Sequence, residues 1–109
     1  MTLTTFDDRE KAHEAKFVRE EEMAFRVTAR RNKLLGHWAA ARMGLTPEET
    51  DSYAKSVVQA DFEEVGDEDV IRKLLGDLTA AQVETNDEEI RKALSDLTVE
   101  ARRQLMESM

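Results

Sequence analysis

The sequence predicts an all-α protein, a four-helix bundle whose long first helix overhangs or is disordered at its N-terminal part. With four glycines and one proline in 109 residues, the chain has little material for the turns of an all-β fold. Capping and turn signals divide the chain into four segments, and apolar residues recur every three or four positions within each. Each segment is apolar on one face only, so the helices must pack together, and short connections favour antiparallel neighbours.

Capping signals predict where the second and third helices begin and where the second helix ends. Thr46 is the expected N-cap of the second helix, with Pro47 at the first helical position and Glu49 as the reciprocal acid of a capping box. Gly66 suits a left-handed residue after a helix, and Asp67 is the expected next N-cap.

The last helix has two overlapping N-cap candidates. Thr85 would pair with Glu88, whereas Asn86 would pair with Glu89, and the sequence leaves both open. The four expected helices cover residues 7–43, 47–65, 67–81 and 87–107.

Apolar stripes within these helices identify the expected core. In the first helix, Trp38 is in register with Leu34 and Ala41, which favours a core position over a ligand contact. The stripe of the first helix consists of Ala24, Val27, Leu34, Leu35, Trp38 and Ala41, and ends at Leu45. That of the second consists of Tyr53, Ala54, Val57, Val58, Phe62 and Val65. The third helix has Val70, Ile71, Leu74, Leu75 and Leu78, and the fourth has Ile90, Leu94, Leu97, Ala101 and Leu105.

The first helix is too long for a compact domain. It would span about 55 Å, against roughly 22–32 Å for the others and a radius of gyration near ~13 Å for a chain of this length. About half of it must overhang, bend away or stay unfolded. In residues 1–18 the apolar stripe thins to Phe6, His13 and Phe17, so we expect disorder or fraying without a partner. We therefore divide the chain into a flexible segment, 1–18, and a helical bundle, 19–109.

Charge is unevenly distributed. The chain carries a net charge of −8, but residues 1–35 hold eight bases and seven acids. A basic patch formed by Arg26, Arg30, Arg31 and Lys33 lies in this part. We expect it to pair with acids of later helices, the candidates being Glu63, Glu64 and Asp67. Nucleic acid is a poor partner, because the acidic body would repel phosphates.

Several kinds of chemistry are excluded. With no cysteine there is no disulfide or thiolate site, and no apolar run approaches a membrane span or a secretion signal. A soluble, cytoplasmic protein is therefore expected. The four glycines lie too far apart for a phosphate-binding loop, and neither histidine lies beside a plausible serine nucleophile, so no enzymatic activity is predicted.

No metal site is predicted either. Glu10 and His13 have the Glu-x-x-His spacing of di-iron bundles, but His37 is preceded by Leu34 instead of a second glutamate. The acidic run from Asp67 reads as a helix start, since apolar and basic residues follow where calcium ligands are needed. His13 is better interpreted as a partner contact whose charge changes near neutral pH.

Runs along nearly the whole chain resemble one known family. They are TFDDREK (5–11), EAKF (14–17), ARRNKLLG (29–36), WAA (38–40), YAK (53–55), ADFEE (60–64) and GDEDV (66–70). These runs are similar to the zeta subunit of alphaproteobacterial F-type ATP synthases, a family also catalogued as a domain of unknown function. Leu3 and Thr4 look like an extra pair, and His13 stands where the family has an aromatic residue.

The resemblance implies a four-helix, non-enzymatic inhibitor of ATP hydrolysis by the synthase. Its N-terminal segment would fold into an interface between the alpha and beta subunits of the catalytic head and reach the central stalk. There it would block rotation in the hydrolysis direction. The protein would be monomeric when free, and cytoplasmic, held at the inner membrane only through the synthase and not by insertion. The residue His13 could make inhibition depend on pH.

The resemblance and the thin stripe together give the partner-binding residues. Phe6 and Phe17 would anchor in apolar pockets, with charged side chains at the rim. The full set is Phe6, Asp7, Asp8, Arg9, Lys11, His13, Glu14, Lys16 and Phe17.

Two other functions stay open. The bundle could bind a small ligand such as a purine nucleotide, with no other cofactor, through Arg26, Arg30, Arg31, Lys33 and Trp38. Alternatively, the chain could be a scaffold whose N-terminal segment pairs with a second copy.

Overall fold

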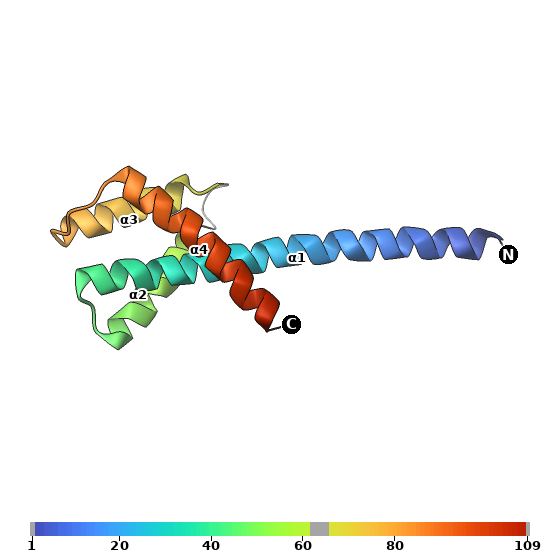
Figure 1. Ribbon diagram of the computed structural model, residues 1–109, viewed down its shortest axis with the longest axis horizontal. Helices are drawn as coiled ribbons and strands as arrows, with labels where there is room; N and C mark the ends of the chain where they lie inside the picture. Colours follow the sequence, from blue (N-terminus) through green and yellow to red (C-terminus); the bar gives the residue numbers. More distant parts are fainter. Residues whose placement is uncertain (1, 62–65, 109) are drawn as a thin grey trace.

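The computed structural model describes residues 2–61 and 66–108, with side chains described from residue 19 onward. Four helices make up this part of the chain (Figure 1). They are α1 (Thr2–Met43), α2 (Pro47–Ala60), α3 (Glu68–Ala80) and α4 (Asp87–Glu107). The described residues contain no strand, so the prediction of an all-α fold is confirmed.

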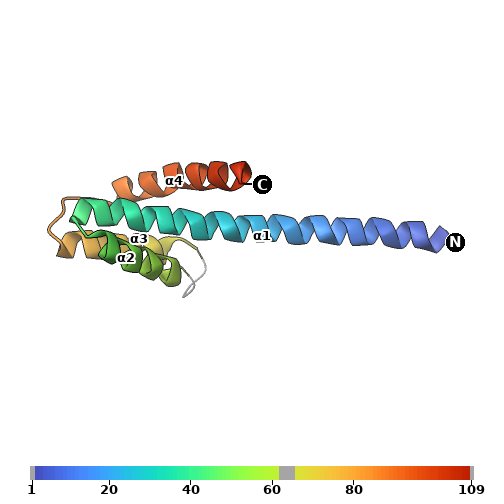
Figure 2. The ribbon, with the colours of Figure 1, turned by 90° about the horizontal axis from the view of Figure 1, so that it is seen from below.

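Helix α1 is the shared axis of the bundle. It contacts the other three helices, with α4 along one side and α2 and α3 along the other, and the described residues of α2 and α4 do not touch (Figure 2). The N-terminal half of α1 extends well beyond the other helices (Figures 1 and 2). As a result the molecule measures 69 × 26 × 21 Å and its radius of gyration is 18.3 Å, well above the compact value of about 13 Å. The predicted overhang is confirmed.

The helix ends differ from the predictions by more than one residue at two places. Helix α1 begins at Thr2 instead of residue 7. Helix α2 ends at Ala60, five residues early, with Asp61 as its C-cap; residues 62–65, which include the expected core residues Phe62 and Val65, lie outside the described residues. Gly66 has φ +101°, which confirms the left-handed position predicted there.

Local capping chemistry fixes the starts of α2 and α4. The Thr46 hydroxyl accepts from the Glu49 backbone N–H at 3.2 Å, and the Thr46 N–H donates to the Glu49 carboxylate at 2.9 Å, so the capping box is confirmed. At α4, the Asn86 side-chain oxygen accepts from the Glu89 N–H at 2.8 Å, which decides between the two candidate caps.

The core lies where α1 meets the other helices. Trp38 packs against it half-buried, with the Arg42 guanidinium 5.1 Å from its ring centroid, which confirms the core interpretation of Trp38. The core cluster consists of Leu35, Ala39, Val57, Val70, Ile71, Leu74, Leu78 and Ile90.

Two expected core residues of α1 are exposed, namely Ala24 and Ala41. The prediction was wrong because it included both alanines in the buried stripe, whereas the other helices cover a different set of α1 positions. Among the described side chains of α1, the buried positions are Val27, Arg31, Asn32, Leu35, Gly36, Ala39 and Ala40. Both alanines line surface hollows beside α2.

The crossing of α1 and α2 depends on a glycine. Gly36 is buried, and a β-carbon there would lie 2.6 Å from the Cα atom of Ala54. Such a contact is too close for any side chain, so the absence of one at position 36 sets how near the two helices approach.

Candidate functional site

The overhanging end of α1 carries the nine expected partner-binding residues. The structure places them by their helical backbone, because the side chains of residues 2–18 lie outside the described part. Positions 6, 13 and 17 are separated by seven and four residues, so they share one face of the helix. Ala24 and the buried Arg31, which follow Phe17 at intervals of seven residues, lie on the same face of α1.

The overhang joins the bundle at Val27, the first buried residue among those whose side chains are described. The positions from Arg19 to Arg26 are exposed or, at Met23, half-buried. The C-terminal part of α4 lies close to this junction. Arg30 Nη1 of α1 donates to the side-chain oxygen of Gln104, near the end of α4, at 3.0 Å.

Arg31 forms the pairing expected for the basic patch. Its Nη2 atom donates to Asp67 Oδ1 at 2.8 Å, and its Nε and Nη2 atoms donate to Asn32 Oδ1 at 3.1 and 3.0 Å. The pairing with Asp67 is therefore confirmed, while the other two candidates, Glu63 and Glu64, lie outside the described residues. Burial of Arg31 and Asn32, at 6% and 1% exposed, was not predicted.

This pairing changes the role of Asp67. The residue precedes α3, as expected, but its side chain makes no capping hydrogen bond to that helix. The carboxylate is directed to Arg31 instead, so it ties the start of α3 to the middle of α1.

The remaining patch residues do not surround one pocket with Arg31. Arg26 is exposed on α1, and Lys33 lines a hollow between α1 and α2. Trp38 lies against the core on another part of α1. The five residues expected to share a ligand thus fall into separate environments.

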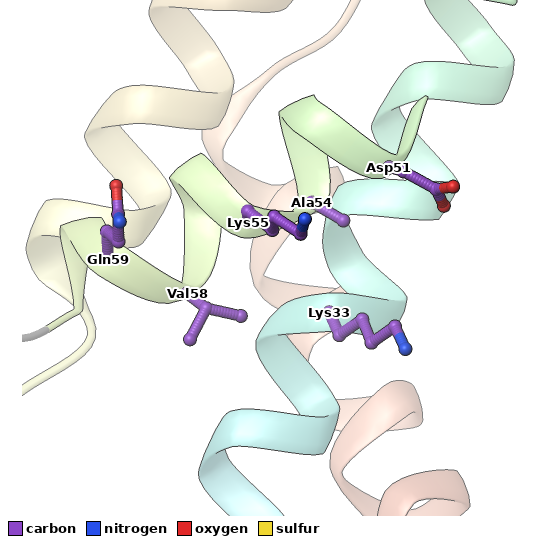
Figure 3. A pocket seen from close by; sticks show the side chains of 6 residues that line it. All are labelled: Lys33, Asp51, Ala54, Lys55, Val58 and Gln59. Atoms are coloured by element: carbon purple, nitrogen blue, oxygen red, sulfur yellow. The ribbon is translucent and has the colours of Figure 1, made fainter. Parts of the chain in front are cut away.

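The hollow beside Lys33 has a volume of about 570 Å³ (Figure 3). Ala54 and Val58 supply its apolar lining, and Lys55 adds a second ammonium group from α2. Its other lining residues are Asp51 and Gln59. Sequence reasoning missed the α2 residues, because only the packing of α2 on α1 brings them beside Lys33.

Neither a metal centre nor a membrane span is found in the described part of the chain. No three side chains of His, Cys, Asp or Glu come together there as metal ligands would. Of the described helices, none combines the length and the apolar character that crossing a bilayer requires.

Comparisons with known proteins decide the family. A family model described as ATPase inhibitor subunit zeta matches residues 3–104. The chain belongs to the ATPase inhibitor subunit zeta family. A solved structure, described as the solution NMR structure of a protein, is similar to this zeta-family chain at 45% identity and a TM-score of 0.71. That match covers 80% of this chain and 99% of the other. A search of curated proteins gave no match.

Family membership confirms the resemblance drawn from the sequence motifs. Members are inhibitor subunits of an ATPase, which is a regulatory class, and the four-helix fold matches the expectation for this family. The place where such a subunit acts on its ATPase is a separate question.

Proposed function

We propose that this zeta-family protein inhibits ATP hydrolysis by the F-type ATP synthase by inserting the overhang of α1 into the catalytic head. Residues 1–18 enter an interface between an alpha and a beta subunit, reach the central stalk and block rotation. The observation that carries the proposal is the extension of α1, a helix of 42 residues, far beyond the three helices that pack on it (Figure 1).

The composition of the overhang suits a helix bound in a groove. Phe6, His13 and Phe17 share a face, and anchors in such a row are how a helix engages an apolar groove. Charged residues of both signs occupy the positions between them and supply contacts at the rim. His13, between the two phenylalanines, makes the interaction sensitive to pH near neutrality.

The dimensions of the molecule explain how insertion stops. A single helix with its side chains is about 10–12 Å wide. The molecule measures 26 × 21 Å across its long axis, because three further helices pack on α1. A cleft that admits the overhang therefore excludes the bundle, which stays outside as a plug.

The proposal defines the partners and the place of action. The partners are the alpha, beta and central stalk subunits of the catalytic head, and the protein is monomeric before it binds. It acts on the cytoplasmic side of the inner membrane, which it reaches through the synthase. Its role requires no catalytic residue and no cofactor.

Removal of residues 1–18 tests the proposal directly. The full chain and the truncated chain are added to ATP synthase membranes from the protein's own host, and ATP hydrolysis is measured. We expect the truncation to abolish inhibition while helicity and melting of the bundle stay nearly unchanged, since Val27 is the first buried residue among those whose side chains are described. Full inhibition by the truncated chain would contradict the proposal.

A second measurement follows the overhang itself. Backbone NMR order parameters of residues 2–18 are compared with and without the purified catalytic head. We expect them to rise toward the rigid value, about 0.85, when the head is present. Values that do not change on addition of the head would rule out insertion of this segment.

A second candidate function is the binding of a small anion such as a purine nucleotide. The hollow of about 570 Å³ favours it, because Lys33 and Lys55 line the same cavity (Figure 3). Titration with ADP should shift backbone NMR signals around Lys33 and Lys55 and not those of Trp38. Shifts confined to residues 2–18 would exclude this site.

A further inference from the structure

Helix α1 carries a row of basic residues on one face. Arg26, Arg30, Lys33 and His37 follow one another at steps of four, three and four, which places them on the same side of the helix. We call these four residues the basic row. The first three are exposed and His37 is half-buried.

The basic row lies between α2 and α4. On one flank, Lys33 lines the hollow that it shares with Lys55 of α2. On the other flank, Arg30 bonds to Gln104 of α4 at 3.0 Å. Since α2 and α4 do not contact each other in the described part, the side of α1 between them is left uncovered (Figure 2).

These bases differ from most bases of the bundle, although Arg19, Lys55 and Arg102 likewise form no ion pair within the described residues. Within the described residues, Arg26, Arg30 and Lys33 form no ion pair, although the chain has 24 acids and 16 bases. Most other bases do have carboxylate partners. The paired ones are Arg31, Arg42, Arg72, Lys73, Arg91, Lys92 and Arg103. A protein with surplus acid that leaves a row of bases unneutralised keeps a local positive field on an acidic body.

We propose that the basic row is a second docking surface, which binds a carboxylate-rich surface of the ATPase head beside the mouth of the cleft that admits residues 1–18. This inference rests on the proposed function. It adds a partner contact made by the bundle itself, with the positive row facing Asp and Glu side chains of the head.

Because α1 is continuous, the basic row lies at a fixed, short distance from the overhang. At 1.5 Å per residue, Arg26 lies about 12 Å beyond residue 18 along the helix axis and His37 lies about 28 Å beyond it. When the overhang fills the cleft, the row therefore begins within about two to three turns of the cleft mouth. No hinge is needed, because α1 is one helix from Thr2 to Met43.

The charge distribution selects a protein surface as the occupant. The chain has a net charge of −8, so it is repelled by extended polyanions such as nucleic acid or an anionic bilayer, whose charge would surround the whole docked protein. A discrete acidic patch can meet the basic row without contacting most of the acidic surface, although Asp51 lines the hollow beside Lys33. Charges at the edge of an interface act chiefly on the association rate and its salt dependence. The row therefore steers α1 toward the cleft and orients the bundle over it.

Charge reversal tests the inference in the full chain. The variant Arg26→Glu/Lys33→Glu is compared with Lys92→Glu/Arg102→Glu, which makes the same charge change on exposed positions of α4. Association with the purified catalytic head is followed at low and high salt. We expect the row variant to associate about tenfold more slowly at low salt, with the difference shrinking as salt rises. The control variant should stay within about threefold of the parent.

The outcomes separate this inference from the proposed function. If the parent chain inhibits and the row variant associates at the parent rate, the inference is overturned and the proposed function stands. If the parent chain does not inhibit, the proposed function fails and the inference falls with it. The milder pair Arg26→Gln/Lys33→Gln should show a smaller loss of the same kind, so a folding defect in the glutamate variant would not hide the effect.

Site-specific cross-linking adds a direct readout. The chain has no cysteine, so Lys33→Cys and Arg102→Cys each create a single attachment point for a photoactivated cross-linker. We expect position 33 to join to an Asp- and Glu-rich segment of the head, and position 102 to give little product. Equal labelling from both positions, or attachment from position 33 to a segment without acidic residues, would contradict the inference.

Discussion

Arg31 and Asp67, which are 36 residues apart, form an ion pair of 2.8 Å between the middle of α1 and the residue before α3. The arginine side chain is 7% exposed and the aspartate side chain 43%, so the pair spans the boundary between core and solvent. Asn32 accepts from the same guanidinium. The start of α3 is therefore fixed by α1 and not by a cap of its own.

The variant Arg31→Met should lower the free energy of unfolding by about 1–3 kcal/mol, because it leaves the buried Asn32 oxygen without its donor and Asp67 without its partner. Urea denaturation gives the value. The control is Arg26→Met, an exposed change on the same helix, for which we expect less than about 0.5 kcal/mol. Equal effects of the two variants would show that the buried pair contributes nothing specific.

The two glycines inside α1 and α3 should respond in opposite directions to alanine. Gly36→Ala places a β-carbon 2.6 Å from the Ala54 backbone, so we expect a loss of about 1–3 kcal/mol in spite of the better helix propensity. Gly76 has open space around it, and Gly76→Ala should gain about 0.5–1 kcal/mol. Thermal unfolding of both variants is the test. A stabilised Gly36→Ala protein would mean that α1 and α2 do not approach so closely.

Tyr53, the only tyrosine, should titrate above its ordinary range. Burial, and then the hydrogen bond of 2.8 Å to Asp77, raise the pKa of its hydroxyl. Because the folded pKa is the higher one, the associated stability is complete below the unfolded pKa of about 10 and declines as pH rises beyond it. Ultraviolet absorbance of tyrosinate gives the folded midpoint. In Tyr53→Phe this decline should be absent, and a folded midpoint near about 10 would disprove the predicted shift.

Phe17→Ala should weaken inhibition by about 1–3 kcal/mol if the ring fills an apolar pocket of the partner. Inhibition constants measured on host ATP synthase membranes give the size of the effect. The melting temperature should not change, since Phe17 lies on the overhang of α1, ahead of Val27, the first buried residue among those whose side chains are described. An unchanged inhibition constant would remove Phe17 from the set of anchors.

Local signals in the sequence predicted much of this fold. The cap at Thr46, and the two candidates Thr85 and Asn86 at the last helix, depend on residues three positions away, so they can be found without knowledge of the tertiary structure. The sequence did not decide between Thr85 and Asn86. The overhang followed from length, because a first helix expected over residues 7–43 is too long to be covered by the helices expected over 47–65, 67–81 and 87–107.

The errors came from interactions over long sequence distances. Ala41 was placed in the core because it continues the apolar stripe of α1, but in the structure it is exposed and lines a hollow beside the start of α2. The Arg31–Asp67 pair was expected, but the burial of Arg31 was not, because burial depends on how α3 packs. Likewise, the approach of Lys55 to Lys33 requires the α1–α2 crossing to be known.

The use of α1 as both the overhang and the shared axis of the bundle has a mechanical consequence. Any torque or pull that a rotating partner exerts on residues 2–18 is transmitted along an unbroken helix to its contacts with α2 and α4. Because α2 and α4 contact opposite sides of α1, the force on α1 is shared between the α1–α2 and α1–α4 interfaces. A tail joined to the domain by a flexible linker would not transmit torque to these contacts, because the linker could twist freely.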